Sequence, residues 1–197
     1  MIFSKHIYTV LLIVTTVLFS GLASSADWTL DQKQSQLNFM SVKKGSIAEN
    51  HQFTSLQGQL NTQGELEINI DLASVDTAID LRNERMKEFL FNTQKYSQAT
   101  LTAQVDLSAV DDMPVASSAV MTVAGTLNLH GQDKALDMIV LVTKLSANNI
   151  VVTSAEPVLL NVADFDLVVG VEKLRELAKL PSISPAVPVT FYITLNK

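Results

Sequence analysis

ELEINIDL, at residues 65–72, is the stretch of sequence that decides the fold. Its four aliphatic residues alternate strictly with four polar ones, so that Leu66, Ile68, Ile70 and Leu72 share one side of an extended chain. A period of two is typical of a strand with one dry face and one wet face. A helix would instead scatter these aliphatic side chains around its circumference.

The same alternation recurs along the rest of the chain. It is regular over residues 99–107, 119–129 and 187–195, and less regular over residues 28–42, 52–60, 134–144 and 149–161. Together with residues 65–72, these segments predict eight strands. Because most of the connections between them are short, neighbouring strands should be antiparallel.

Strands with one dry face can bury it by stacking two sheets or by closing into a barrel. Eight long strands favour the barrel, since closure removes exposed edges, and a sandwich is the alternative. An outer-membrane barrel shares this period, but the chain is only 6% aromatic and lacks aromatic girdles. Residues 82–91 and 172–180 have helical spacing and predict two short amphipathic helices across the ends or outer wall.

Residues 1–26 have the order of a secretory signal: a short polar start, an apolar run over residues 7–18, and small residues ending at Ala26. One domain then spans residues 27–197, which is long enough for a sizeable core. The expected location is the periplasm, with secretion as the alternative. The chain has no cysteine, which excludes disulfides and thiolate metal sites.

Composition also limits the chemistry of the domain. Without Lys5, 13 basic residues face 20 acidic ones, and the net charge of −7 argues against nucleic-acid binding. His51 and His130 are the only histidines of residues 27–197, which is too few for a metal site with three or four ligands. Both lie near predicted loops or strand ends, so we expect them to be exposed. No nucleophile elbow or phosphate loop is present, so we predict no catalytic residue, no metal and no enzymatic activity.

Two features leave alternatives open. A dense group of charges, which enters the first predicted helix, either caps the helix and pairs on its surface or holds a ligand headgroup at the barrel mouth. This group consists of Asp76, Asp80, Arg82, Glu84 and Arg85. Small residues on the dry face, which are Ala99, Ala103 and Gly125, fit either a fully packed core or a cavity suited to hydrocarbon.

Several stretches of the chain match known motifs in order and spacing. They are WTLD (28–31), SQLNF (35–39), ASVDT (73–77), RNERM (82–86), KY (95–96), GTLNLHG (125–131) and NVADFDL (161–167). On these stretches the chain resembles the YceI-like family over essentially all of residues 27–197. It departs from the family pattern at Val162, where arginine is common, at Asp166 (glycine), at Arg85 (histidine) and at Ser97 (proline). Residues 171–185 also differ and contain a helix of their own.

The resemblance implies a lipocalin-like barrel with a tunnel that binds a long-chain isoprenoid, such as a quinone or polyprenyl phosphate, or a similar long-chain amphiphile. The function expected from it is carriage or storage of this lipid in the periplasm, in stress response, with no required cofactor. Transient membrane contact and a monomer or homodimer are also expected. The alternative function is a protein-interaction or stress-scaffold module with a filled barrel and no lipid.

Strand parity then assigns the site residues. The expected tunnel lining is Phe39, Leu66, Ile68, Ile70, Leu101, Val105, Met121, Val123, Leu127, Phe191 and Ile193. The expected lid and mouth are Asp76, Arg82, Arg85, Met86, Phe89 and Leu90. A register slip of one residue would move the set of any one strand to the outer face.

Overall fold

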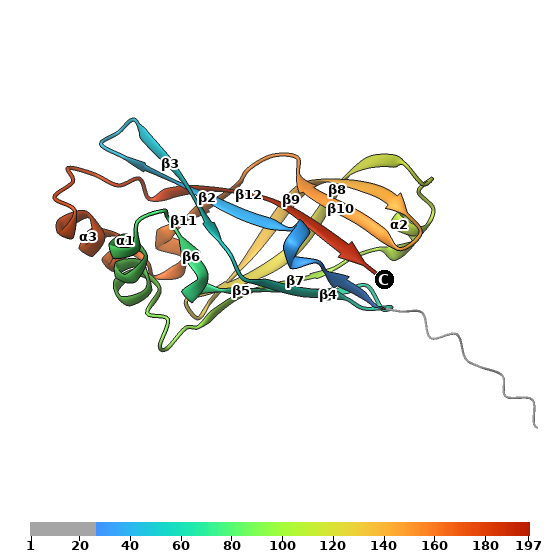
Figure 1. Cartoon of the computed structure of the whole chain (residues 1–197), viewed down its shortest axis with the longest axis horizontal. Helices are drawn as coiled ribbons and strands as arrows, with labels where there is room; N and C mark the ends of the chain where they lie inside the picture. Colours follow the sequence, from blue (N-terminus) through green and yellow to red (C-terminus); the bar gives the residue numbers. More distant parts are fainter. Residues whose placement is uncertain (1–26) are drawn as a thin grey trace, which may run out of the picture.

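A computed structural model describes residues 27–197, and the predicted signal at residues 1–26 lies outside them. The described residues form a single twelve-stranded sheet with short helices between some strands (Figure 1). The strands are β1 (Trp28–Leu30), β2 (Gln36–Lys43), β3 (Ile47–Phe53), β4 (Leu56–Leu60), β5 (Glu65–Asp71), β6 (Val75–Asp76), β7 (Gln98–Gln104), β8 (Ser117–Leu129), β9 (Gln132–Ser146), β10 (Asn149–Ser154), β11 (Val158–Asn161) and β12 (Ala186–Asn196).

The sheet closes into an eight-stranded antiparallel barrel. Four pairs of consecutive strands, β1/β2, β3/β4, β5/β6 and β10/β11, act as single interrupted strands, because both members of a pair run along the same neighbours. The last strand, β12, pairs with the first, joining Leu195 to Leu30 and Phe191 to Leu37. The predicted barrel is confirmed, and its closure excludes the sandwich.

Two of the interruptions, within β1/β2 and β5/β6, and the end of β11 share a local cause. In each, an Asp or Asn side chain accepts a hydrogen bond from the backbone N–H two residues ahead, at 2.9–3.0 Å. Such local bonds compete with the ladder bonds of a strand and favour a tight turn. The capping residues are Asp31, Asp71 and Asn161, and the turns that follow are η1 (Gln32–Gln34), η2 (Leu72–Ser74) and η4 (Val162–Phe165).

The longer helices gather at one end of the barrel. There, α1 (Asp80–Arg85) continues directly into a π-helix, η3 (Met86–Phe91), and α3 (Val168–Leu177) packs against η3. Figure 1 shows these helices at the end from which the β2–β3 hairpin projects, with α2 (Leu107–Asp111) at the opposite end. The sequence predicted α1–η3 and α3 but not α2, which is only five residues long. None of the helices in residues 27–197 is long and apolar enough to cross a membrane.

The barrel interior differs between its two ends. Toward α2, it is packed with side chains that are at most 3% exposed, including Trp28, Leu60, Val110 and Ile150. None of these four lines the cavity that occupies the other end. The helices and the projecting hairpin therefore surround the open half of the barrel.

Candidate functional site

A cavity of about 490 Å³ lies in the half of the barrel near α1 and α3. This volume is within the roughly 300–1,000 Å³ that is usual for small-molecule sites. The inward faces of β5, β7, β8 and β12 form the apolar wall, with Ile70, Ala99, Leu101, Leu127 and Phe191. Part of the dry face that the sequence revealed thus forms the wall of the cavity.

Two helical segments cover the cavity. Met86, Leu90 and Phe91 line it from η3, and Val171 and Leu174 line it from α3. The two segments touch at Gly170, where an added Cβ would lie 2.6 Å from the carbonyl oxygen of Phe89. Glycine is therefore needed at this position for α3 to lie directly on η3.

The β2–β3 hairpin adds a wall whose polarity changes along its length. In its cross-strand pairs, Leu37 faces Phe53, Phe39 faces His51, and Ser41 faces Glu49. All six side chains line the cavity. The wall is therefore apolar deep in the barrel and polar toward the hairpin tip, where Lys43 continues the same face.

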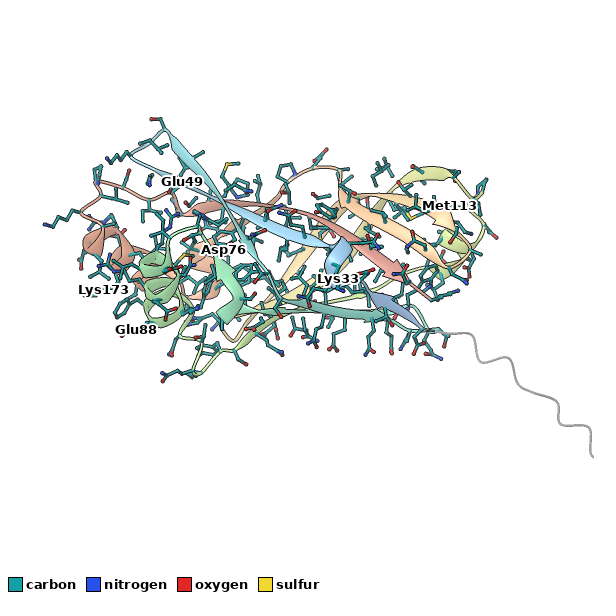
Figure 2. The ribbon with its side chains drawn as sticks, in the orientation of Figure 1. Lys33, Glu49, Asp76, Glu88, Met113 and Lys173 are labelled. Carbon is teal, nitrogen blue, oxygen red and sulfur yellow. The ribbon has the colours of Figure 1, made fainter. Side chains whose placement is uncertain are left out.

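Charged groups meet at the tip end of this wall. Glu49 Oε2 accepts from Lys43 Nζ at 2.7 Å and from Arg82 Nη1 at 2.8 Å. Arg82 also donates from Nη2 to the carbonyl of Thr77 at 2.6 Å. The hydrogen bond from Lys43, helped by the charge of Arg82, holds the pKa of the Glu49 carboxyl below its ordinary value. Figure 2 shows Glu49 on the hairpin, at the same end as Glu88 and Lys173 and opposite Met113.

His51 is buried at 3% exposure, so the expectation that it is exposed is wrong. Its Nε2 lies 2.9 Å from Ser41 Oγ, and its ring lies 5.2 Å from that of Phe39. Burial, assisted by the charge of Arg82, lowers the pKa of His51. Within residues 27–197, neither His51 Nδ1 nor the buried Arg82 Nε has a hydrogen-bond partner. Two polar atoms are therefore left unpaired beside the cavity.

The lowered pKa of His51 predicts a loss of stability in mild acid. The unfolded chain takes up a proton near its ordinary pKa of 6.5, while folded His51 stays neutral to lower pH. The unfolding free energy should therefore fall as pH drops below about 6.5, by at most about 1.4 kcal/mol down to about pH 5.5. Urea unfolding at the two pH values measures this, and His51→Gln should reduce the difference. An unchanged pH dependence in the variant would contradict the assignment to His51.

Comparison with known proteins identifies the family. The YceI-like domain family matches residues 28–195. The chain belongs to the YceI-like family. A polyisoprenoid binding domain from Saccharophagus degradans, implicated in plant cell wall breakdown, is 44% identical, with a TM-score of 0.84 over 86% of this chain and 97% of that one.

More distant solved structures share the fold. BcnA from Burkholderia cenocepacia is 18% identical, with a TM-score of 0.64 over 84% of this chain and 98% of that one. A YCEI protein from Campylobacter jejuni is 14% identical, with a TM-score of 0.55 over 75% of this chain and 84% of that one. No curated protein matches the chain.

The structure shows the surroundings of three residues that depart from the YceI-like pattern. Asp166, at the glycine position, has φ of 54° and ψ of 29°, a left-handed conformation that favours glycine. Its carboxylate accepts from Gln132 Nε2 at 2.8 Å, which ties the turn to β9. Val162 and Arg85, at the arginine and histidine positions, both line the cavity. Two of the three changes thus alter the surroundings of the cavity itself.

Five of the eleven residues predicted to line the tunnel lie on the cavity wall: Phe39, Ile70, Leu101, Leu127 and Phe191. The other six do not line it and belong to the packed side of the barrel: Leu66, Ile68, Val105, Met121, Val123 and Ile193. Parity places both sets on the inner face, but only the position along the barrel axis decides which of them border empty space. A binding role for these residues stays a prediction.

Among the predicted lid and mouth residues, Arg82, Arg85, Met86 and Leu90 border the cavity, whereas Asp76 and Phe89 do not. Asp76 lies in β6, where its carboxylate accepts hydrogen bonds from Gln52 Nε2 at 3.1 Å and the Ala78 N–H at 2.8 Å. These bonds, the backbone one first, hold the pKa of Asp76 below its ordinary value. Asp76 thus fixes the start of the turn into α1 and does not border the cavity. Lys173 Nζ lies 6.0 Å from the ring of Phe89.

The sequence argument missed the polar part of the hairpin wall. Ser41, Lys43, Glu49 and His51 share the parity of Phe39 and Phe53, so alternation alone could have placed them inside. The predicted strands end at residue 42 and resume at residue 52, so Lys43, Glu49 and His51 fall outside them. No group of three or more His, Asp or Glu in the described chain is arranged to hold a metal ion.

Proposed function

We propose that this YceI-like protein binds a long-chain isoprenoid lipid, such as a prenyl quinone or polyprenyl phosphate, and carries or stores it in the periplasm. The cavity is the observation that carries the proposal, since it is walled by apolar side chains and opens beside a polar group. The 44% identical relative described as a polyisoprenoid binding domain supports the same ligand class. The predicted signal at residues 1–26 supports export. The role proposed is non-enzymatic.

The rival function, an interaction module with a filled barrel, predicts an interior without room for a chain. The interior has that character only in the half of the barrel near α2. The other half holds a cavity of about 490 Å³, which favours a ligand over a scaffold role.

Exposed apolar residues at the opening fit a lipid cargo that passes to and from a membrane. Ile79 and Leu81 border the cavity, yet they are 50% and 60% exposed. The hairpin tip and helical segments around the opening, at residues 40–50, 77–91 and 167–185, carry eight of the 14 basic residues but only six of the 20 acidic ones. The opening therefore carries more basic than acidic residues in a chain that is acidic overall, which suits transient contact with an anionic bilayer.

Lipid extraction and lipid uptake test the proposal together. Burial of each CH₂ group contributes roughly 0.8 kcal/mol, so affinity should rise with each added isoprene unit and level off once the cavity is full. Mass spectrometry of organic extracts from purified protein should find a bound isoprenoid. Uptake of a prenyl chain-length series from vesicles should show the rise and the plateau. An empty protein that also takes up no chain of any length would refute the proposed function.

A further inference from the structure

One section of the cavity wall is not joined by backbone hydrogen bonds. The strand β9 pairs with β10 only from Val140 onward, and the last bond beyond this pairing runs from the Ala155 N–H to the Ile139 carbonyl at 2.9 Å. Further along the chain, β11 pairs with β12 alone. Within residues 27–197, no strand pairing therefore joins residues 132–138 of β9 to β11.

A proline explains why the ladder stops at this point. Continuing the register of β9 and β10 would place Pro157 opposite Asp137, two residues beyond the bond from Ala155 to Ile139. Since ladder bonds recur every two residues, the next one would need an N–H at residue 157. Proline has no N–H, so the ladder ends there. The chain resumes as β11 beside β12 only.

Side chains alone close the cavity along this break in the ladder. Leu136 and Met138 line the cavity from β9, and Val158 and Leu160 line it from β11. Met138 and Val158 belong to one apolar cluster. Methionine is unbranched and adapts its shape easily to its surroundings. The wall can therefore part between β9 and β11 without the loss of any backbone hydrogen bond.

The volume of the cavity is too small for a long isoprenoid chain. If each carbon needs about as much room as a water molecule, roughly 30 Å³, then 490 Å³ encloses about 16 carbons, or about three isoprene units. Because the half of the barrel near α2 is packed, the rest of a longer chain leaves either beside α1 and α3 or through the wall. Outside the break, Ile139 and Leu159 are 37% and 71% exposed and offer apolar surface to a chain that leaves there.

We propose that the break between β9 and β11 is a lateral outlet, through which the end of an isoprenoid chain too long for the cavity leaves the barrel. The cavity then binds the first few isoprene units, and the outlet allows the chain to be longer than the cavity. This inference rests on the proposed function and adds how the same site accommodates long chains.

A cross-link across the break tests the outlet. Ala135 and Leu159 are exposed and would face each other if the ladder continued, so Ala135→Cys and Leu159→Cys can be joined by a bis-maleimide in this cysteine-free chain. The probes are two prenyl quinones, one with three isoprene units and one with eight. The cross-link should weaken binding of the long quinone by about tenfold or more and leave binding of the short one unchanged.

A cross-link across an intact part of the barrel is the matched control. Thr126 and Ala135 are both exposed and pair directly in the β8–β9 ladder. Thr126→Cys and Ala135→Cys, joined by the same reagent, should change neither affinity. Equal losses for both quinones in the protein cross-linked across the break, or no loss at all, would overturn the inference and mean that a long chain leaves beside α1 and α3.

A single substitution tests the outlet without a cross-link. Pro157→Val supplies the missing N–H, which can then donate to the Asp137 carbonyl and extend the ladder over the break. Pro157 is exposed, so the change leaves the cavity lining intact. It should weaken binding of the long quinone selectively, and unchanged binding in a variant whose residue 157 amide is protected from hydrogen exchange would contradict the outlet. If unmodified protein binds neither quinone, the proposed function itself fails.

Discussion

Ala99→Trp should abolish lipid uptake and leave the barrel folded. Ala99 is 3% exposed, lines the cavity and pairs across the sheet with Ile70, so an indole at this position points into the space that the chain of the lipid would occupy. We expect binding to weaken by at least about a hundredfold, equivalent to roughly 2.7 kcal/mol. In a packed core, overpacking costs about 1–3 kcal/mol, but here the added ring enters empty space. Lipid uptake and urea unfolding, measured on the same protein, separate the two effects.

Thr102→Trp is the matched control for this prediction. Thr102 lies on the same strand, β7, but it is exposed and does not line the cavity. The same indole on the outer face should leave uptake unchanged. If Ala99→Trp binds lipid as well as unmodified protein does, the cavity is not the binding site. If it unfolds while Thr102→Trp does not, the wall around Ala99 is packed rather than open.

Alternation of apolar and polar residues predicted most of the strands and favoured a barrel, with a sandwich as the alternative. It works where each strand has one dry face, as in residues 65–72, because the period of two then appears directly in the sequence. It fails where both faces carry polar residues. The strand β3 begins at Ile47, five residues before the predicted start. The prediction starts too late because Glu49 and His51, which are polar, occupy inward positions of the strand. The same residues that hid the strand form the polar end of the cavity.

The cavity was harder to predict than the barrel, for a geometric reason. Parity tells which side of the sheet a residue faces, but not where along the barrel axis it lies. Ile68 and Ile70 are two residues apart on the same face of β5, and only Ile70 reaches the cavity. The difference depends on how far the strands are staggered and on which helices cover the end. Neither quantity is encoded in one strand.

The second prediction with a large expected effect is the loss of stability on substitution of Gly170, where α3 contacts η3. Helix propensity alone predicts that Gly170→Ala stabilises α3 by up to about 1 kcal/mol. Packing predicts the opposite, since the new Cβ would lie 2.6 Å from the Phe89 carbonyl oxygen and 2.8 Å from Leu90 Cα. Both of these are backbone atoms, which can yield only if the whole of η3 moves.

We therefore expect packing to decide the outcome at Gly170. Gly170→Ala should lower the unfolding free energy by about 1–2 kcal/mol, and Gly170→Val by about 3 kcal/mol. Since η3 and α3 both line the cavity, forcing them apart should also speed lipid release, as stopped-flow transfer to acceptor vesicles would measure. Val169→Ala is the control, because Val169 is adjacent, 81% exposed and should change stability by less than about 0.5 kcal/mol. A Gly170→Ala protein that is more stable than the parent, with unchanged release, would mean that α3 does not close the cavity against η3.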